Sequence, residues 1–122
     1  MTSYVADTSV LLAWYLSENF SESARVWRQK LLSDSVRLIV PSLHYWEFGN
    51  LLRTYIMRKE LTAELAKEIF DLHLEAPLEI HDPEKAAVFD TALAYGATMY
   101  DAVFNALSLS LDLPLLTAEK ST

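Results

Sequence analysis

The stretch YVADTSVLLAWYL, residues 4–16, places one carboxylate, Asp7, in a run of otherwise mostly apolar side chains. The pattern predicts a strand that ends at Asp7 and a helix over residues 10–16 that Thr8 or Ser9 caps. An ionised carboxylate is costly to bury unless it is paired, hydrogen-bonded or bound to a metal ion. Asp7 therefore needs a partner, and the nature of that partner indicates the function of the protein.

The length and composition of the chain are those of one intracellular domain. Its 122 residues suffice for one hydrophobic core and are too few for two. No apolar run approaches the roughly 20 residues of a membrane span, and no signal-peptide pattern stands at the N-terminus. Cysteine is absent, which excludes disulfides and thiolate metal sites. We therefore expect a single domain over residues 1–122 that is soluble, cytoplasmic and without membrane partners.

The net charge of −7 and the pI near 4.8 disfavour nucleic-acid binding through bulk charge, because a phosphate backbone prefers a basic face. They do not exclude a nuclease, since a carboxylate cluster that holds divalent cations presents positive charge locally. The chain contains only 2 glycines, which excludes a glycine-rich phosphate-binding loop. A metal ion or side chains must therefore handle any phosphate.

Apolar runs and turn signals alternate along the chain in the manner of an α/β protein. Strands are predicted at 4–7, 36–42, 78–81 and 114–119, and helices at 10–16, 21–34, 44–60, 61–74, 83–95 and 101–113. Asp82 and Pro83 predict the N-cap and first residue of the fifth helix, and Gly96 fits the left-handed position after its end. Strands that are apolar on both faces predict a central parallel sheet covered on both sides. Ligands bind such sheets outside the carboxyl ends of the strands.

Four carboxylates stand at this predicted edge of the sheet: Asp7, Glu47, Asp101 and Glu119. Two of them end strands, and two lie in the first turns of helices that leave the sheet. The apolar face of the helix over 44–60 comprises Tyr45, Phe48, Leu52 and Tyr55, and Glu47 lies off that face. Carboxylates packed together repel one another unless a cation compensates. Oxygen ligands without cysteine or clustered histidine select Mg²⁺ or Mn²⁺ over Zn²⁺, and such ions activate water and orient a phosphodiester.

Each of these acids also has a purely structural interpretation. Asp7 can cap the helix that follows it. Glu47 can be an acid that the helix dipole favours in a first turn. Asp101 can be an N-cap or a first-turn acid, and Glu119 can be a solvated surface residue. The conjunction of four acids at one sheet edge, with Asp7 in an apolar run, favours the metal site.

The three histidines, His44, His73 and His81, are scattered and make no metal-ligand spacing such as HExxH. His44 precedes Glu47 by about one helical turn and can face the site. A histidine in this position is more often a helix-start or surface residue. We therefore predict no catalytic role for the histidines.

Three segments carry a resemblance to a known family. VADTSVLLAW at 5–14, PSLHYWEFGNLL at 41–52 and TMYDAVFNALSLSLDLPLLTAEK at 98–120 resemble a PIN domain. More narrowly, they resemble the VapC-type toxin ribonucleases of toxin–antitoxin pairs. The resemblance spans the whole chain in order, and it implies an α/β/α sandwich on a parallel sheet. It also implies an acidic cluster that binds Mg²⁺ or Mn²⁺ and hydrolyses single-stranded or looped RNA.

The resemblance assigns a role to each position that matches the family's motifs. Asp7, Glu47 and Asp101 correspond to metal-site acids, and Glu119 falls at the fourth acidic position. Ser9 and Thr117 match hydroxyl positions that line the family's site, where they hydrogen-bond an acid, a bound water or phosphate. Family members are typically homodimers that bind a cognate VapB-like antitoxin, so the resemblance implies both partners in addition to the RNA substrate.

Two features depart from the family pattern. The fourth acidic position usually holds aspartate, whereas this chain has Glu119. The chain also stops at Thr122, where the family continues through another helix and a final strand. We therefore expect a PIN-like domain that lacks this last helix and strand, with Glu119 as the least secure of the four acids.

Three other interpretations compete with a metal-dependent endoribonuclease. Glu119 and the early end of the chain suggest a catalytically weak PIN-fold module that mainly engages an antitoxin or RNA. A phospho-acceptor signalling domain also uses acids at strand ends, but it needs paired acids after its first strand, where this chain offers only Asp7. A purely structural protein leaves Asp7 without a partner and is the least favoured.

Overall fold

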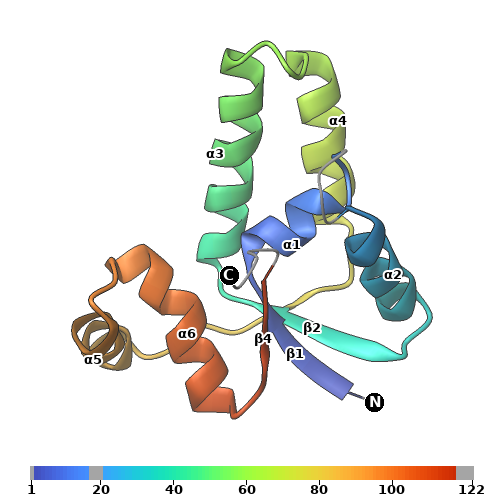
Figure 1. Cartoon of the computed structure of the whole chain (residues 1–122). Helices are drawn as coiled ribbons and strands as arrows, with labels where there is room; N and C mark the ends of the chain where they lie inside the picture. The colour runs from blue at the N-terminus through green and yellow to red at the C-terminus, as the bar shows by residue number, and fades with distance from the viewer. Residues whose placement is uncertain (1, 17–20, 118–122) are drawn as a thin grey trace.

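Four parallel strands form the centre of the structure, in the order β3-β2-β1-β4 (Figure 1). This computed structural model describes residues 2–16 and 21–117. The strands are β1 (Thr2–Ala6), β2 (Val36–Val40), β3 (Glu79–Ile80) and β4 (Leu115–Leu116). All four overlap the predicted strand segments, and the predicted α/β fold with a parallel sheet is confirmed.

Six helices accompany the sheet in the described residues: α1 (Thr8–Ala13), α2 (Ser21–Leu32), α3 (Leu43–Met57), α4 (Ala63–Leu74), α5 (Lys85–Tyr95) and α6 (Met99–Leu111). Figure 1 shows α3 and α4 as a hairpin that rises from the sheet, with α2 on one side of the molecule and α5 and α6 on the other. None of the helices in this part of the chain has both the length and the hydropathy needed to cross a membrane.

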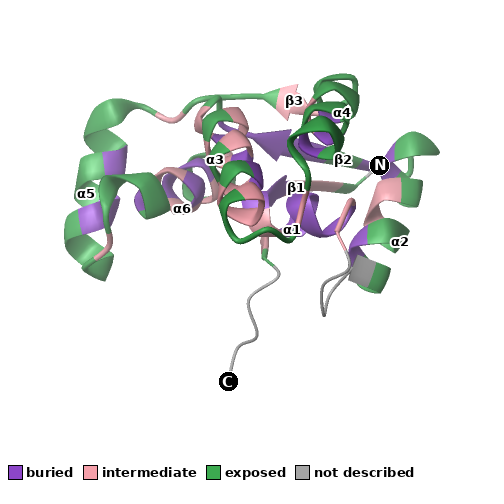
Figure 2. Cartoon of the chain, turned by 90° about the horizontal axis from the view of Figure 1, so that it is seen from above, coloured by how far each residue is buried: buried purple, intermediate pink, exposed green. Residues whose placement is uncertain are grey.

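Both faces of the sheet are buried, because consecutive strand residues point to opposite sides. Ala6 and Leu38 form one core with side chains of α1 and α2. Val5 and Ile39 pack on the other face against Leu107 of α6. In Figure 2 the buried strands β1 and β2 lie between these helices. Burial on both faces is characteristic of parallel sheets, and it explains why the strands read as continuous apolar runs.

Helix α1 follows β1 after a single residue, Asp7. Oδ1 of Asp7 accepts a hydrogen bond from the backbone N–H of Val10 at 3.3 Å and so caps the helix. The prediction that Thr8 or Ser9 caps a helix beginning at Val10 is therefore wrong, because both residues already lie within α1. The structural interpretation of Asp7 as an N-cap is correct, and the cap keeps its carboxylate at the end of β1.

The α3–α4 hairpin is held together by an aromatic core. Phe48 of α3 is fully buried, and its ring stacks on that of His73 in α4 with the centroids 4.1 Å apart. Leu52 and Ile69 belong to the same core cluster. Phe48 and Leu52 of the predicted apolar face are therefore core residues. Trp46, two residues before Phe48, is 74% exposed.

Helix α5 begins two residues later than the sequence predicts. Its first residue is Lys85 and its N-cap is Glu84, so the prediction of Asp82 as N-cap and Pro83 as first residue is wrong. The Asp82 carboxylate instead accepts hydrogen bonds from the backbone N–H of Ser42 at 2.8 Å and from its hydroxyl at 3.0 Å. Asp82 and Ser42 follow neighbouring strands, β3 and β2, which brings the side chain within reach of the turn before α3.

The end of α5 agrees with the prediction. Gly96 follows Tyr95 with φ of 62°, in the left-handed region that glycine adopts without strain. The turn brings the chain back so that α5 packs against α6, with Val88 and Ala92 meeting Ala102 and Ala106.

We expect replacement of Phe48 by alanine to lower the free energy of unfolding by about 3–5 kcal/mol, because it opens a cavity in the α3–α4 core. Trp46→Ala is the matched control on the same helix, and we expect it to change that free energy by no more than about 0.5 kcal/mol. Urea unfolding followed by circular dichroism measures both. A larger loss for Trp46→Ala than for Phe48→Ala would contradict this description of the core.

Candidate metal centre

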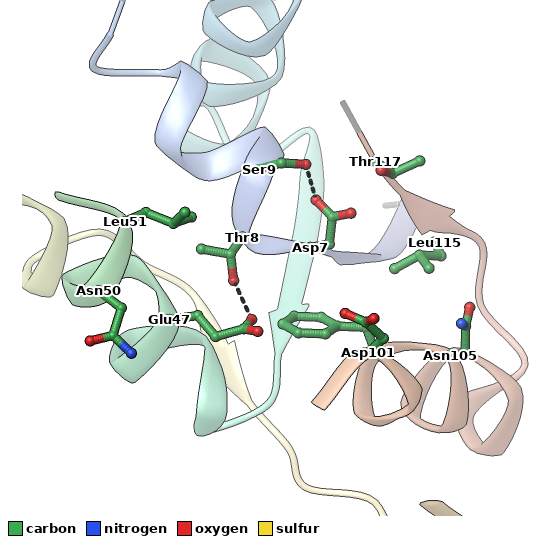
Figure 3. Close-up of a pocket in the computed structure, with 11 residues that line it drawn as sticks. Asp7, Thr8, Ser9, Glu47, Asn50, Leu51, Asp101, Asn105, Leu115 and Thr117 are labelled. Carbon is green, nitrogen blue, oxygen red and sulfur yellow. Dashed lines mark hydrogen bonds between the residues drawn. The ribbon is translucent and has the colours of Figure 1, made fainter. Parts of the chain in front are cut away.

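A pocket of about 720 Å³ opens at the carboxyl ends of β1 and β4. The strand order reverses here, since the chain runs from β1 through β2 to β3 on one side and returns to β4 on the other. Such switch points are where α/β sheets bind ligands. The pocket is lined by Asp7, Thr8, Ser9, Glu47, Asn50, Leu51, Asp101, Phe104, Asn105, Leu115 and Thr117 (Figure 3).

Asp7 lies where β1, β4 and α1 meet. Its backbone N–H donates to the carbonyl oxygen of Leu116 at 3.0 Å, which extends the pairing with β4 beyond the last residue of β1. The Ser9 hydroxyl donates to Oδ1 of Asp7 at 2.5 Å, the same oxygen that caps α1. In Figure 3 the other carboxylate oxygen is turned away from Ser9. The cap and a ligand role therefore do not exclude each other.

Glu47 reaches the pocket from α3 and is half-buried. Its Oε1 accepts a hydrogen bond from the Thr8 hydroxyl at 3.0 Å. Burial raises the pKa of the Glu47 carboxyl above its ordinary value, and the negative charges of Asp101 and Asp7 raise it further. The hydrogen bond from Thr8 opposes this shift by stabilising the ionised form. Glu47 therefore lies within the electrostatic influence of both other acids.

Asp101 enters the pocket from the first turn of α6 and is exposed. Thr98, and not Asp101, is the N-cap of this helix, and the Thr98 hydroxyl oxygen accepts a hydrogen bond from the backbone N–H of Asp101 at 3.1 Å. Of the two structural interpretations of Asp101, the first-turn position is correct and the N-cap is wrong. Capping uses the backbone of Asp101, which leaves its carboxylate directed to the pocket.

The structure thus brings three of the four predicted acids to one pocket, together with the predicted hydroxyl residues Ser9 and Thr117. Glu119 lies outside the described residues. Besides Thr8, two polar pocket residues are missing from the predicted site, Asn50 and Asn105. Each stands one helical turn from a predicted acid, three residues after Glu47 and four after Asp101, and this spacing places side chains on the same helix face.

The chemistry of these side chains fits a hard divalent cation. Three carboxylates line the pocket, whereas its lining contains no lysine, arginine or histidine to balance them. Hydroxyl and amide oxygens complete a lining of oxygen donors, which Mg²⁺ and Mn²⁺ prefer. Among the described residues, no three acidic or imidazole side chains converge tightly enough to form a complete metal cage. Mg²⁺ does not require one, because it keeps several waters and binds through one or two carboxylates.

Two histidines lie directly behind this pocket. His44 lies at the start of α3, as predicted, but it is buried rather than on the surface. His44 of α3 and His73 of α4 are 0% and 1% exposed, and their Nε2 atoms lie 2.7 Å apart. Nδ1 of His44 lies 3.0 Å from the Thr8 hydroxyl, which also contacts Glu47. The only sequence signal was the one-turn spacing from His44 to Glu47. His81 is exposed.

A parallel sheet with an acidic pocket at its switch point defines the general class of α/β proteins to which this chain belongs. Within this class, the PIN domain family matches residues 4–121, and the chain belongs to that family. PIN-domain nucleases typically use divalent metals, in agreement with the oxygen donors of the pocket.

The chain is also distantly homologous to VapC toxin ribonucleases. It is 26% identical to ribonuclease VapC3 of Pyrobaculum aerophilum over 120 residues, which cover 95% of this chain and 88% of that protein. The resemblance to the PIN family and to VapC toxins that the sequence motifs predict is confirmed.

Solved structures share the fold. The crystal structure of PAE2754 from Pyrobaculum aerophilum matches with a TM-score of 0.76 at 22% identity, over 98% of this chain and 76% of that one. VapC20 of Mycobacterium tuberculosis, a toxin that cleaves the sarcin–ricin loop, matches with a TM-score of 0.64 at 14% identity, over 90% and 84%. VapBC2 of Rickettsia felis, solved with a DNA fragment from its promoter, matches with a TM-score of 0.64 at 16% identity, over 97% and 88%.

We expect Glu47→Gln to raise the free energy of unfolding at pH 7 without divalent cations, because burial and the charges of Asp101 and Asp7 disfavour the ionised carboxyl in the folded protein. The gain should be no more than about 1 kcal/mol, since solvent screens part of this effect. Folding raises the pKa of this carboxyl, so the ionised form destabilises the folded state above that pKa. Glutamine stays neutral and can still accept the bond from Thr8. Below the ordinary glutamate value of 4.5 wild-type Glu47 is protonated in both states, and the difference should vanish.

Urea unfolding at several pH values measures this effect. Glu68→Gln, on the exposed surface of α4, is the matched control and should show no comparable gain at pH 7. A Glu47→Gln protein that is less stable than the wild type at pH 7 would contradict the upward shift of the Glu47 pKa.

Proposed function

We propose that this chain is a Mg²⁺- or Mn²⁺-dependent endoribonuclease and the toxin component of a VapBC-type toxin–antitoxin pair. The observation that carries the proposal is the meeting of three acids from three separate segments in one pocket at the carboxyl edge of the sheet. Membership in the PIN family and the distant homology to VapC ribonucleases support it.

In this proposal Asp7, Glu47 and Asp101 hold the cation, and Glu119 is the fourth acid. A cation held there would supply positive charge for the phosphodiester and would make a water more acidic, which is the chemistry that hydrolysis needs. Ser9 holds the Asp7 carboxylate through its hydrogen bond. Hydrolysis by water leaves a 5′-phosphate and a 3′-hydroxyl on the RNA.

The remaining polar residues of the pocket are suited to hold the RNA. Asn50, Asn105 and Thr117 offer hydrogen-bonding groups around the acids, and Figure 3 shows the two asparagines on opposite sides of the pocket. Neutral groups can bind phosphate and sugar oxygens without adding to the negative charge. The acidic chain as a whole has a net charge of −7, so affinity for RNA depends on the cation more than on bulk charge.

We further propose a cognate VapB-like antitoxin, a homodimeric assembly and a location in the cytoplasm, with residues 1–122 as one PIN domain. The solved VapBC2 of Rickettsia felis supports the antitoxin. Several large apolar side chains of α5 and α6 are exposed and offer a surface for a protein partner; they include Phe89, Leu93, Tyr100 and Leu109.

A second candidate is a catalytically weak PIN-fold module that mainly engages an antitoxin or RNA. The observation that favours it is that no three side chains among residues 2–16 and 21–117 form a complete metal cage. The two candidates differ in whether RNA is cleaved. The binding module holds metal or RNA but does not cleave the RNA.

We expect Asp7→Asn to reduce Mn²⁺-dependent cleavage of a mixed pool of structured RNAs by about a hundredfold or more, since it removes a charged metal ligand. Asparagine is as good an N-cap as aspartate, so the variant should keep α1 and the fold. Asp71→Asn, on the exposed surface of α4, is the matched control and should cleave like the wild type. Gel analysis of end-labelled RNA measures all three proteins.

Equal cleavage by the wild type and Asp7→Asn would reduce Asp7 to a helix cap and contradict the proposal. Mn²⁺ binding by a wild-type protein that cleaves no RNA in the pool would favour the binding module instead. Circular dichroism of each variant excludes loss of the fold as the cause.

A further inference from the structure

A continuous chain of side-chain hydrogen bonds runs behind the pocket, and the members of this hydrogen-bond relay are Tyr15, His73, His44, Thr8 and Glu47. The Tyr15 hydroxyl lies 2.9 Å from Nδ1 of His73, and the two histidines meet at 2.7 Å. The last two links, from His44 to Thr8 and from Thr8 to Glu47, are each 3.0 Å long (Figure 3 shows the last). The relay therefore joins α1, α3 and α4 and ends on a carboxylate of the candidate metal centre.

The Glu47 end determines the direction of every bond in the relay. The Thr8 hydroxyl donates to Oε1 of Glu47, which uses its single proton. Thr8 must then accept from Nδ1–H of His44. Since a neutral imidazole has one N–H, Nε2 of His44 accepts from Nε2–H of His73. Nδ1 of His73 in turn accepts from the Tyr15 hydroxyl.

Both histidines are neutral in this arrangement. The contact between their Nε2 atoms already requires that one of them accepts, which a doubly protonated ring cannot do. Burial lowers the pKa of His44 to about 3, with a further contribution from His73. Burial also lowers the pKa of His73 to about 4, and the positive charge of Arg28 adds to the shift. The relay therefore passes through two neutral imidazoles.

We infer that the hydrogen-bond relay is a positioning device for the metal centre, in which the two histidines act through Thr8 to hold the Glu47 carboxylate in place. This inference rests on the proposed function, because it assigns the relay a role only if Glu47 holds the cation. Groups that hydrogen-bond a metal-binding carboxylate orient it and strengthen the site. Thr8, His44 and His73 are positioning residues in this scheme, since none of the three is among the acids that would hold the cation.

Packing alone does not explain this arrangement. Two fully buried imidazoles could be replaced by apolar side chains of similar size without any need for hydrogen bonds. Here every bond aligns in one sense, from Tyr15 toward Glu47, and aligned hydrogen bonds polarise one another in a buried environment. The positive charge of Arg28 lies at the Tyr15 end, opposite the carboxylate. The polarity of the relay thus stabilises negative charge at the metal centre.

Thr8→Val tests the inference, because valine keeps the shape of the side chain and removes the hydroxyl that links His44 to Glu47. We expect it to weaken Mn²⁺ binding, measured by isothermal titration calorimetry, by about tenfold. Thr8→Ser restores the hydroxyl and should restore the affinity. Thr91→Val is the matched control: Thr91 is also buried, and its hydroxyl donates to the carbonyl oxygen of Ala87 at 2.8 Å within α5. Its Mn²⁺ affinity should equal that of the wild type.

A second readout needs no metal. Nitrogen-15 spectra of the metal-free wild type at pH 7 should show opposite neutral tautomers, with the proton on Nδ1 of His44 and on Nε2 of His73. Thr8→Val removes the acceptor of the His44 proton, so these unique tautomers should be lost, whereas Thr91→Val should keep them. A purely structural role for Thr8 predicts no such change.

The outcomes separate this inference from the proposed function. A wild type that binds Mn²⁺ no more tightly than Thr8→Val, or wild-type histidines with other tautomers or a charge at pH 7, would overturn the positioning role and leave the metal site standing. A wild type that binds no Mn²⁺ would overturn the proposed function and, with it, the role of the relay. A tenfold loss in Thr8→Val with rescue by Thr8→Ser supports both.

Discussion

Parallel pairing of β1 on both of its edges is the constraint on which the site depends. β2 and β4 run in the same direction as β1, so the chain leaves all three strands at one end of the sheet. Pairing with β4 continues through the backbone of Asp7 to Leu116, which places the residue after β1 beside the residue after β4. The acidic pocket follows from this geometry, since α3 and α6 bring their N-terminal parts to the same edge. Glu47 lies past the first turn of α3, so the first-turn position predicted for it is wrong.

Burial acts on ionisable groups of opposite charge within the hydrogen-bond relay, the Glu47 carboxylate and the two imidazoles. It raises the pKa of the Glu47 carboxyl and lowers those of His44 and His73, because a low-dielectric environment disfavours any charged form. The histidines respond by staying neutral and passing hydrogen bonds toward the carboxylate. The bond from Thr8 opposes the shift at Glu47, and in the proposed function the cation would oppose it further.

Helix α3 serves the core and the candidate site with adjacent residues. Successive side chains on a helix diverge by about 100°, so Glu47 points to the pocket while Phe48 is fully buried against α4. His44, one turn earlier, lies between these two directions and joins the core to the site. The position of the Glu47 carboxylate therefore depends on how α3 packs against α1 and α4.

Local sequence signals determined the features that depend on periodicity and backbone preference alone. They predicted the four strands, the glycine at the end of α5, and the approximate places of Asp7, Glu47 and Asp101. The ends of strands and helices depend on residues that are close in sequence, so local patterns predict them. Glu119 stays a prediction, since it lies outside the described residues. Only the tertiary structure brought together His44 and His73, which are 29 positions apart, and turned Asp82 from the predicted cap toward Ser42. These contacts depend on which strands pair and on how the helices pack. The spacing of residues within one segment contains no information on either.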